Sequence, residues 1–402
     1  MTPVDAELSG YAEARFSYQI GVDGVPWALV ERVRPRFTIA PSDRVSAEVV
    51  VEGALAQGRD SSKVILDKML ASELGPVLEN GGCTFYDRGA TYAGTTGYLS
   101  VERLHLDFNL PAVDLKIGRQ SLRWGSGLAF HPTDLYAEVL LQEPWREARG
   151  VNAVRADIPV GDSQITGVVA VDDDLSDLYA ETPSAPLVSG AVKATLRALE
   201  TDWSAIGQVK TDGDWFAGAD LRGTIGVGWW VEGGWHGGAA APEVVVGVDY
   251  SFPVLNRFYI AAEYRYDGTG AAPEAYDYSA RYSGDAAPFA CDFLAGSSTA
   301  PRTTLGVHYV DQVTSVQFTE DVGITNSVVV NLVDGTGLLV PDVFYNIGSR
   351  VAVHASAQIP FGTDGEFRPD ASHLVYSVGT AQADLSGIYP DATLFGWVRY
   401  SF

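Results

Sequence analysis

The sequence predicts an all-β fold, a single antiparallel up-and-down transmembrane β-barrel of about 18 strands. Two observations predict it. Segments of about ten residues alternate between apolar and polar or charged side chains along most of the chain, and the links between them are alternately short and long. A strand that is apolar on one face and charged on the other suits a wall with lipid outside and water inside. We expect residues 1–402 to form this one barrel domain.

The alternation defines eighteen strands. An even number of strands brings both ends of the chain to the same end of the barrel. Sixteen is the alternative, because residues 203–236 and 303–347 contain few turn signals. The expected strand cores, in chain order, are 9–20, 28–40, 45–56, 98–110, 113–124, 149–159, 163–172, 188–199, 203–211, 215–223, 227–236, 243–252, 257–267, 303–319, 326–334, 338–347, 350–360 and 392–402.

The links differ in length at the two ends of the predicted barrel. Short polar turns are expected at 41–43, 111–114, 160–162, 200–202 and 253–256, and long loops at 58–96, 129–147, 173–187, 268–301 and 363–390. In the first long loop, residues 62–74 carry apolar side chains at helical spacing. They predict a short amphipathic loop helix that either caps the mouth of the barrel or folds inward.

The composition agrees with a barrel without proving one. Hydrophobic residues make up 46% of the chain, and no apolar run approaches the ~18 residues of a membrane helix, as expected when only alternate residues face lipid. The nine Trp, 19 Tyr and 16 Phe fit strands with aromatic girdles. The net charge of −24 argues against nucleic acid as a partner.

The last strand ends on an aromatic residue. Leu394, Gly396, Val398, Tyr400 and Phe402 share one face, while Arg399 and Ser401 lie on the other. This ending resembles the closing strand of bacterial outer-membrane β-barrels, whose C-terminal Phe is read by the barrel-assembly machinery. The resemblance implies location in the bacterial outer membrane, with membrane lipid and lipopolysaccharide around the wall. It also implies periplasmic turns, extracellular long loops and contact with the assembly machinery through Phe402.

The segment 118–136 breaks the alternation. Leu115 and Ile117 set a lipid-facing phase, in which Arg119 and Arg123 would also point into lipid. Either a bulge at Gly118 or a strand that leaves the wall resolves this conflict. We expect the segments 62–74 and 118–136 to be the parts of the chain that obstruct the lumen.

In the same segment, an arginine-containing strand leads through Trp124-Gly into a Pro-Thr-Asp134 loop, and Arg119 and Arg123 belong to this loop motif. Together with the later stretches 331–337 and 358–362, the run resembles alginate-export-like and related porin-type barrels. The resemblance supports the architecture and says little about the transported substance.

Charged residues on the inner face carry the functional prediction. An arginine side chain stays charged in a pore and binds carboxylate, phosphate or sugar hydroxyl groups, and an excess of arginine favours anions. The alternative is that these residues pair with one another and stiffen the wall. Arg32, Arg34 and Arg36 stand out, because three successive inward arginines exceed what one neighbouring strand readily neutralises. The predicted lumen residues are Arg15, Arg32, Arg34, Arg36, Glu48, Arg103, Arg155, Arg197, Arg222 and Arg265.

Enzymatic and metal sites are not predicted. The six histidines show no ligand spacing and no attached nucleophile motif, so we expect no catalytic residues, no metal and no cofactor. Cys83 and Cys291 both lie in long loops on the same predicted side, and in an exported chain they are expected to form one disulfide.

Three functional classes stay open. The first is a porin-like channel for passive passage of small, anionic or hydroxylated solutes through an arginine-lined lumen. The second is a conduit for secretion of an acidic polysaccharide. The third is a structural or complex-forming barrel with a closed lumen.

Overall fold

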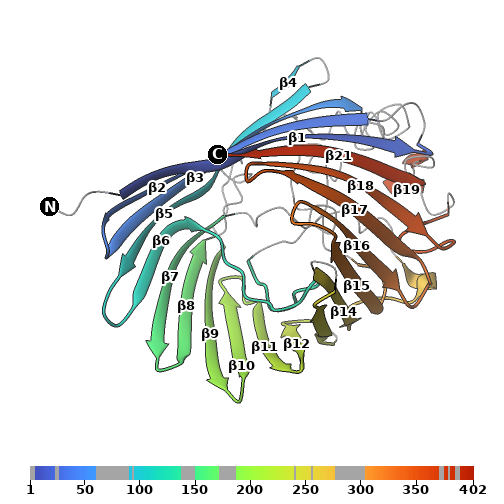
Figure 1. Ribbon diagram of the computed structural model, residues 1–402. Coiled ribbons are helices and arrows are strands. Elements are labelled where there is room, and N and C mark those ends of the chain that lie inside the picture. The colour runs from blue at the N-terminus through green and yellow to red at the C-terminus, as the bar shows by residue number, and fades with distance from the viewer. Residues whose placement is uncertain are drawn as a thin grey trace.

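The protein is a closed antiparallel β-barrel (Figure 1). The computed structural model describes residues 5–22, 27–59, 90–92, 95–136, 150–171, 187–239, 241–254, 257–276, 304–370, 375–378, 381–384 and 390–402. Eighteen strands make the wall, and the short β4 (Ala90–Tyr92) pairs with the edge of one of them, β5.

The wall strands follow one another around the barrel in chain order, so the topology is up-and-down. They are β1 (Asp5–Ile20), β2 (Trp27–Ser42), β3 (Val45–Arg59), β5 (Thr95–Asn109), β6 (Asp114–Gln120), β7 (Val151–Val160), β8 (Ser163–Val171), β9 (Val188–Ala198), β10 (Thr201–Lys210), β11 (Trp215–Ile225), β12 (Val227–His236), β13 (Glu243–Phe252), β14 (Arg257–Asp267), β15 (His308–Gln317), β16 (Val322–Asn331), β17 (Gly337–Ile347), β18 (Val351–Phe361) and β21 (Ala392–Ser401).

The first and last strands close the barrel. β1 pairs with β2 on one side and with β21 on the other, with Ala12 opposite Tyr400. The backbone groups of Gly10 and Phe402 exchange two hydrogen bonds of 3.0 Å. Gly10 has φ +147°, and a β-carbon there would lie 2.4 Å from the Arg34 carbonyl oxygen, so glycine permits this close approach. The prediction of eighteen strands is confirmed, and the alternative of sixteen is wrong.

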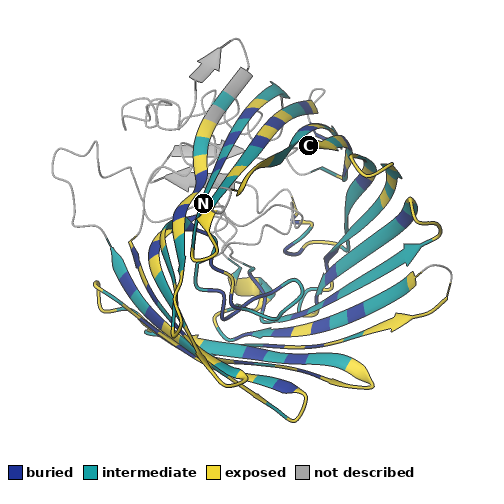
Figure 2. Cartoon of the chain, turned by 60° about the vertical axis from the view of Figure 1, so that its left-hand side comes forward, coloured by how far each residue is buried: buried dark blue, intermediate teal, exposed yellow. Residues whose placement is uncertain are grey.

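Residues of different burial alternate along the wall strands (Figure 2), as expected if the two faces of the wall differ. On β2, Val33 and Phe37 are 50% and 44% exposed, whereas Arg32 and Arg34, on either side of Val33, are 5% and 2% exposed. On β21, Leu394, Val398 and Tyr400 are exposed on the outer face, as is the following Phe402, and Trp397 is buried on the inner face. The outer face is therefore apolar, and the charged face points into the barrel.

Several strand boundaries differ from prediction, and β1, for example, begins at Asp5 instead of residue 9. β6 ends at Gln120 instead of residue 124, because the chain turns into the barrel there. β15 spans 308–317 instead of 303–319, since Leu305 and Gly306 donate their backbone N–H groups to Glu366 and Tyr309 instead of to a strand. β16 begins at Val322, four residues earlier than expected.

Some elements were not predicted, and some predictions cannot be compared with the structure. The connection 363–390 contains the hairpin β19 (Val375–Val378) and β20 (Ala381–Asp384), and the 3₁₀ turn η2 spans Pro273–Ala275.

The expected helix at 62–74, Cys83 and Cys291 lie outside the described residues, so the loop helix and the disulfide stay predictions. Within the described ranges, no helix is long and apolar enough to cross a membrane.

The apolar outer face generates the first prediction. Val248 lies in the middle of β13 and is 49% exposed outward, so Val248→Arg should destabilise the barrel in a bilayer by about 2–4 kcal/mol. Urea titration of the protein refolded into lipid vesicles measures this, with Val248→Leu as the matched control. Equal midpoints for the Arg and Leu variants would contradict a lipid-facing position.

Candidate functional site

The lumen is narrowed by a segment of its own chain. After β6, residues 121–136, called the inserted loop below, leave the wall and cross the inside of the barrel toward β14 (Figure 1). Gly118 has φ +122°, and a β-carbon there would lie 2.2 Å from the Leu104 carbonyl oxygen. Of the two solutions to the phase conflict, the strand does leave the wall, and the left-handed Gly118 lies just before the departure. The segment that was expected to obstruct the lumen therefore lies inside the barrel.

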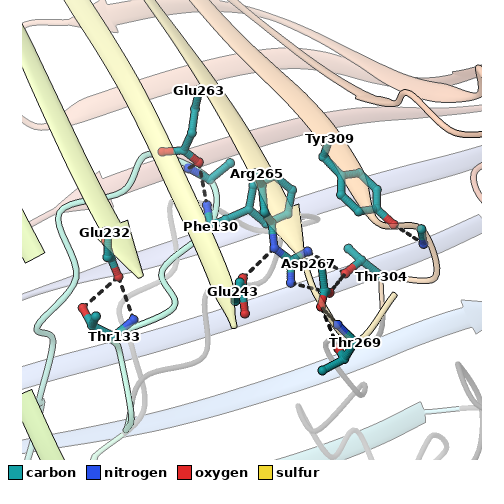
Figure 3. Close-up of polar contacts among 12 residues, drawn as sticks. Phe130, Thr133, Glu232, Glu243, Glu263, Arg265, Asp267, Thr269, Thr304 and Tyr309 are labelled. Atoms are coloured by element: carbon teal, nitrogen blue, oxygen red, sulfur yellow. Dashed lines mark hydrogen bonds and ion pairs between the residues drawn. The ribbon is translucent and has the colours of Figure 1, made fainter. Parts of the chain in front are cut away.

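Glu232 on β12 holds one part of the inserted loop. Its fully buried carboxylate accepts hydrogen bonds from the backbone N–H groups of Ser126 (2.9 Å), Gly127 (2.8 Å) and Thr133 (2.7 Å). The Thr133 hydroxyl donates a fourth bond of 2.8 Å (Figure 3). A loop that crosses a barrel cannot pair its N–H groups in a sheet, so this wall carboxylate satisfies them instead.

Glu263 on β14 holds the next part in the same way. Its carboxylate accepts the backbone N–H groups of Leu128 (2.6 Å), Ala129 (3.2 Å) and Phe130 (3.0 Å), and the indole N–H of Trp230 at 2.8 Å. Together, Glu232 and Glu263 accept the backbone N–H groups of the five consecutive residues 126–130 and of Thr133. The two carboxylates therefore fix the course of the loop along the wall.

A lysine and an aspartate anchor the start of the loop. Lys193 on β9 donates to the Trp124 carbonyl oxygen (2.7 Å), and the Ser126 hydroxyl donates to Asp220 on β11 (2.8 Å). Lys193 and Asp220 are themselves 3.6 Å apart. Trp124 of the predicted loop motif is buried in an apolar cluster with residues of β7 to β11, and its ring meets Tyr136 edge-on at 5.8 Å.

Arg265, one of the predicted lumen residues, is part of this anchor. It is buried, ion-paired with Glu243 (2.5 Å) and Asp267 (2.9 Å), and its guanidinium lies 4.6 Å from the centre of the Phe130 ring (Figure 3). Phe130 packs beside Tyr309 in the second apolar cluster. Arg265 thus clamps the inserted loop through a cation–π contact, which is the wall-stiffening alternative for this residue.

Arg32 and Arg34 are also ion-paired, with carboxylates from two neighbouring strands, whereas the prediction considered one neighbouring strand. Arg32 lies 3.3 Å from Glu13 on β1 and 3.5 Å from Glu52 on β3, and Arg34 lies 3.0 Å from Glu52. Arg399 on β21 adds a 2.6 Å contact to Glu13. The carboxylates come from both strands that flank β2, namely β1 and β3.

Arg36 has a different environment, because it lines a basic pocket in the lumen. This pocket, of about 320 Å³, lies between β2, β3, β5, β6 and the start of the inserted loop. Four cationic side chains and one carboxylate line it. The lining residues are Arg36, Glu48, Arg103, His105, Lys116, Ser121 and Arg123.

Two cations of this basic pocket, Arg36 and Arg123, are more exposed than the acids beside them. Arg36 is 40% exposed and its partner Glu48, 3.6 Å away, is 24% exposed. Arg123 is 50% exposed and Asp134, 3.8 Å away, is 2% exposed. Because an exposed charge meets a passing solute before a buried one does, the surface that this pocket offers is positive. Arg103 is held by a hydrogen bond of 2.8 Å to the Glu102 carbonyl oxygen.

The remaining predicted residues are spread over the wall. Arg15 lies over the Phe395 ring at 5.9 Å, Arg155 pairs with Asp157 at 2.7 Å, and Arg197 makes two bonds to Asp202. Arg222 makes no hydrogen bond or ion pair with a residue that the structure describes. It lines a second pocket of about 330 Å³ together with Arg197, Asp202 and Trp230. Arg119, the last member of the loop motif, lies near the end of β6 opposite Asn152.

Apart from the residues spread over the wall, the predicted residues form two groups. Arg36, Glu48, Arg103 and Arg123 come together at one pocket, whereas Arg32, Arg34 and Arg265 are consumed by internal pairs. Lys116 and His105 of the pocket were not singled out by the sequence. The role of Glu232 on β12 and Glu263 on β14 was not predicted either, although their inward phase was the available signal. Across the described ranges, no group of three or more His, Cys, Asp or Glu side chains could hold a metal ion.

Solved structures with this fold come from the outer membrane of bacteria. The chain is similar to OccAB1 of Acinetobacter baumannii (TM-score 0.53, 9% identity, 99% of this chain and 96% of that chain). It is also similar to the outer membrane protein OpdK of Pseudomonas aeruginosa (0.52, 10%, 99% and 98%). A third is OccK2 (OpdF) of Pseudomonas aeruginosa, crystallised in complex with glucuronate (0.51, 12%, 99% and 98%).

No protein-family model and no curated protein matches the sequence. The chain has the fold of bacterial outer-membrane porins. The resemblance to outer-membrane barrels is confirmed at the level of the fold, and the apolar outer face fits a membrane.

The carboxylates that hold the inserted loop generate the second prediction. Glu263→Ala should speed amide hydrogen exchange at residues 128–130 by about 10-fold or more, since a hydrogen bond to a charged group contributes ~1.5–3 kcal/mol. Exchange followed by mass spectrometry measures it. Asp249→Ala is the matched control, because Asp249 is an inward carboxylate whose bond goes to Tyr259 on the wall. Unchanged exchange at residues 128–130 would show that the loop does not depend on Glu263.

Proposed function

We propose that this protein is a bacterial outer-membrane channel for passive passage of small, anionic or hydroxylated solutes, and that it is not an enzyme. The observation that carries the proposal is the basic pocket, where Arg36, Arg103, Lys116 and Arg123 face the lumen beside the inserted loop. The porin fold supports the outer-membrane location and the channel. The pocket supports the preference for negative or hydroxyl-rich solutes.

The chemistry of the pocket suits such solutes. Guanidinium groups donate several hydrogen bonds in one plane, which matches a carboxylate or a pair of sugar hydroxyls. A partly exposed arginine keeps part of its hydration, so a solute can bind and leave again, as passage requires. The pocket is large enough for a small organic acid. Glucuronate, present in the similar structure of OccK2, is an acid of this class.

The charge balance of the lumen supports the same preference. Three acidic residues of β11, β12 and β14 are buried and accept hydrogen bonds from the inserted loop, so they are not exposed to a solute. They are Asp220, Glu232 and Glu263. Two arginines of the basic pocket, Arg36 and Arg123, stay exposed. An anion in the lumen would then meet more positive than negative charge.

The inserted loop bears on the two other functional classes. By narrowing the lumen, it makes a sliding path for a polysaccharide less suitable than a path for single small solutes. A single-channel recording on the purified protein tests the proposal. Ohmic conductance supports a channel, block by acidic oligosaccharide would favour the conduit, and absence of current would favour a closed barrel.

The basic pocket generates the third prediction. The double variant Arg36→Gln, Arg123→Gln should lower the anion-over-cation permeability ratio by about two-fold or more, because it removes two exposed fixed charges from a confined pore. Reversal potentials in a salt gradient measure this ratio. The matched control is Arg32→Gln, Arg34→Gln, which removes two arginines already neutralised by Glu13 and Glu52.

The two double variants separate two causes. If net charge of the wall alone set selectivity, both would change the ratio equally. If exposed charge sets it, the Arg36 and Arg123 variant changes it more. A ratio equal to wild type in the Arg36 and Arg123 variant would overturn the proposed role of the pocket.

We also propose partners for the wall, namely membrane lipid, lipopolysaccharide and the barrel-assembly machinery, the last through Phe402. The resemblance of the final strand supports this, together with the outward exposure of Phe402. Deleting Phe402 should reduce assembled barrel in cells and leave refolding into detergent largely intact, because little buried area is lost. Heat-modifiable migration in gels measures both. Wild-type assembly of the truncated chain in cells would remove Phe402 as a recognition signal.

A further inference from the structure

Polar side chains lie on the outer face of β15 and β16, in the middle of the apolar belt. Tyr309 and Asp311 on β15 are buried on the inner face, so Gln312 and Thr314 point outward. Val329 on β16 packs against the inserted loop's cluster, so Asn326, which has the opposite parity, points outward as well.

The neighbouring strands confirm this orientation. In the sheet register, Val310 is opposite Tyr264, and Ile324 is opposite Val343. Tyr264 and Val343 are exposed on the outer face. Gln312 follows Val310 by two residues and Asn326 follows Ile324 by two, so both share that face.

The polar groups form one compact patch, called the amide patch below. Thr314 and Asn326 are directly opposite each other in the register, and the Gln312 amide donates a hydrogen bond to the Thr314 hydroxyl. The Asn326 side chain, although partly exposed, makes no hydrogen bond to any residue within the described ranges. Pro341, opposite Asn326 on β17, has no N–H to offer it.

The patch lies at the level where lipid offers no partner. Along β15 it is bracketed by Val310 and Val316, and along β16 by Ile324 and Val328. A carboxamide in hydrocarbon is costly unless its donors and acceptors are paired, because no water replaces them. The side chains beside the amides on the neighbouring strands are small, because Ala262 is opposite Gln312 and Pro341 is opposite Asn326. Another surface can therefore approach the wall closely here.

We propose that the amide patch is an interface at which two copies of this chain associate in the membrane. Every backbone edge of a closed barrel is already paired, so a partner must bind face-on through side chains. A carboxamide both donates and accepts, so Asn326 of one copy can pair with Asn326 of another across a two-fold axis. The same residues on both sides then satisfy each other, and no further protein is needed.

Two measurements test the interface in lipid nanodiscs. Native mass spectrometry should show a dimer or a multiple of it for the wild type, and the double variant Gln312→Leu, Asn326→Leu should raise the dissociation constant at least ten-fold. The matched control is Val246→Leu, Val248→Leu, which changes two outward residues of β13 and should leave the oligomer as in the wild type. Conductance identical to wild type in the double variant shows that the barrel is folded.

Crosslinking places the contact. In a background with Cys83→Ser and Cys291→Ser, Asn326→Cys should give a disulfide-linked dimer on mild oxidation, and Val248→Cys should not. A monomeric wild type, an unchanged oligomer in the Gln312 and Asn326 double variant, or equal crosslinking at both positions would each overturn the proposal. These outcomes do not depend on which solute the channel carries.

Discussion

The whole structure depends on one constraint, that a wall between lipid and water must pair every backbone N–H and C=O group within itself. Eighteen strands meet this constraint by closing on themselves, with β1 paired to β21 and Gly10 bonded to Phe402. Closure then determines which side chains face lipid and which face the lumen. Alternate residues must be apolar outside, and the others are free to be charged inside.

The inserted loop meets the same constraint by another route. It leaves the sheet at Gln120, so its N–H groups have no strand to pair with. Glu232 and Glu263 supply the acceptors from the wall. One consequence is structural, because the loop is fixed along β9 to β14. The other is electrostatic, because these acids are withdrawn from the solute path while the arginines opposite stay exposed. The same hydrogen bonds therefore fix the inserted loop and make the exposed charge of the lumen more positive.

Much of the fold could be predicted from the sequence, since a period of two residues identifies both a strand and its faces. All eighteen strands were located, and the phase of β2 and β21 was right. The failures occur where tertiary contacts override the local pattern. Alternation alone extends β6 to residue 124, yet Trp124 is buried in a cluster with residues of β7 to β11. No local signal in 121–124 reveals the distant carboxylates that draw the loop inward.

The candidate site shows the same limit more sharply. Arg32, Arg34 and Arg36 are the same residue type at the same phase of one strand, and the sequence treats them alike. Their environments differ because the buried Glu13 and Glu52 lie beside the first two, on strands to either side, whereas Arg36 is 40% exposed and lies 3.6 Å from the partly exposed Glu48. The charge that a barrel presents to a solute is thus decided by register between strands, which alternation within one strand does not contain. A row of inward arginines predicts a charged lumen, and only the paired register shows which of its members a solute can meet.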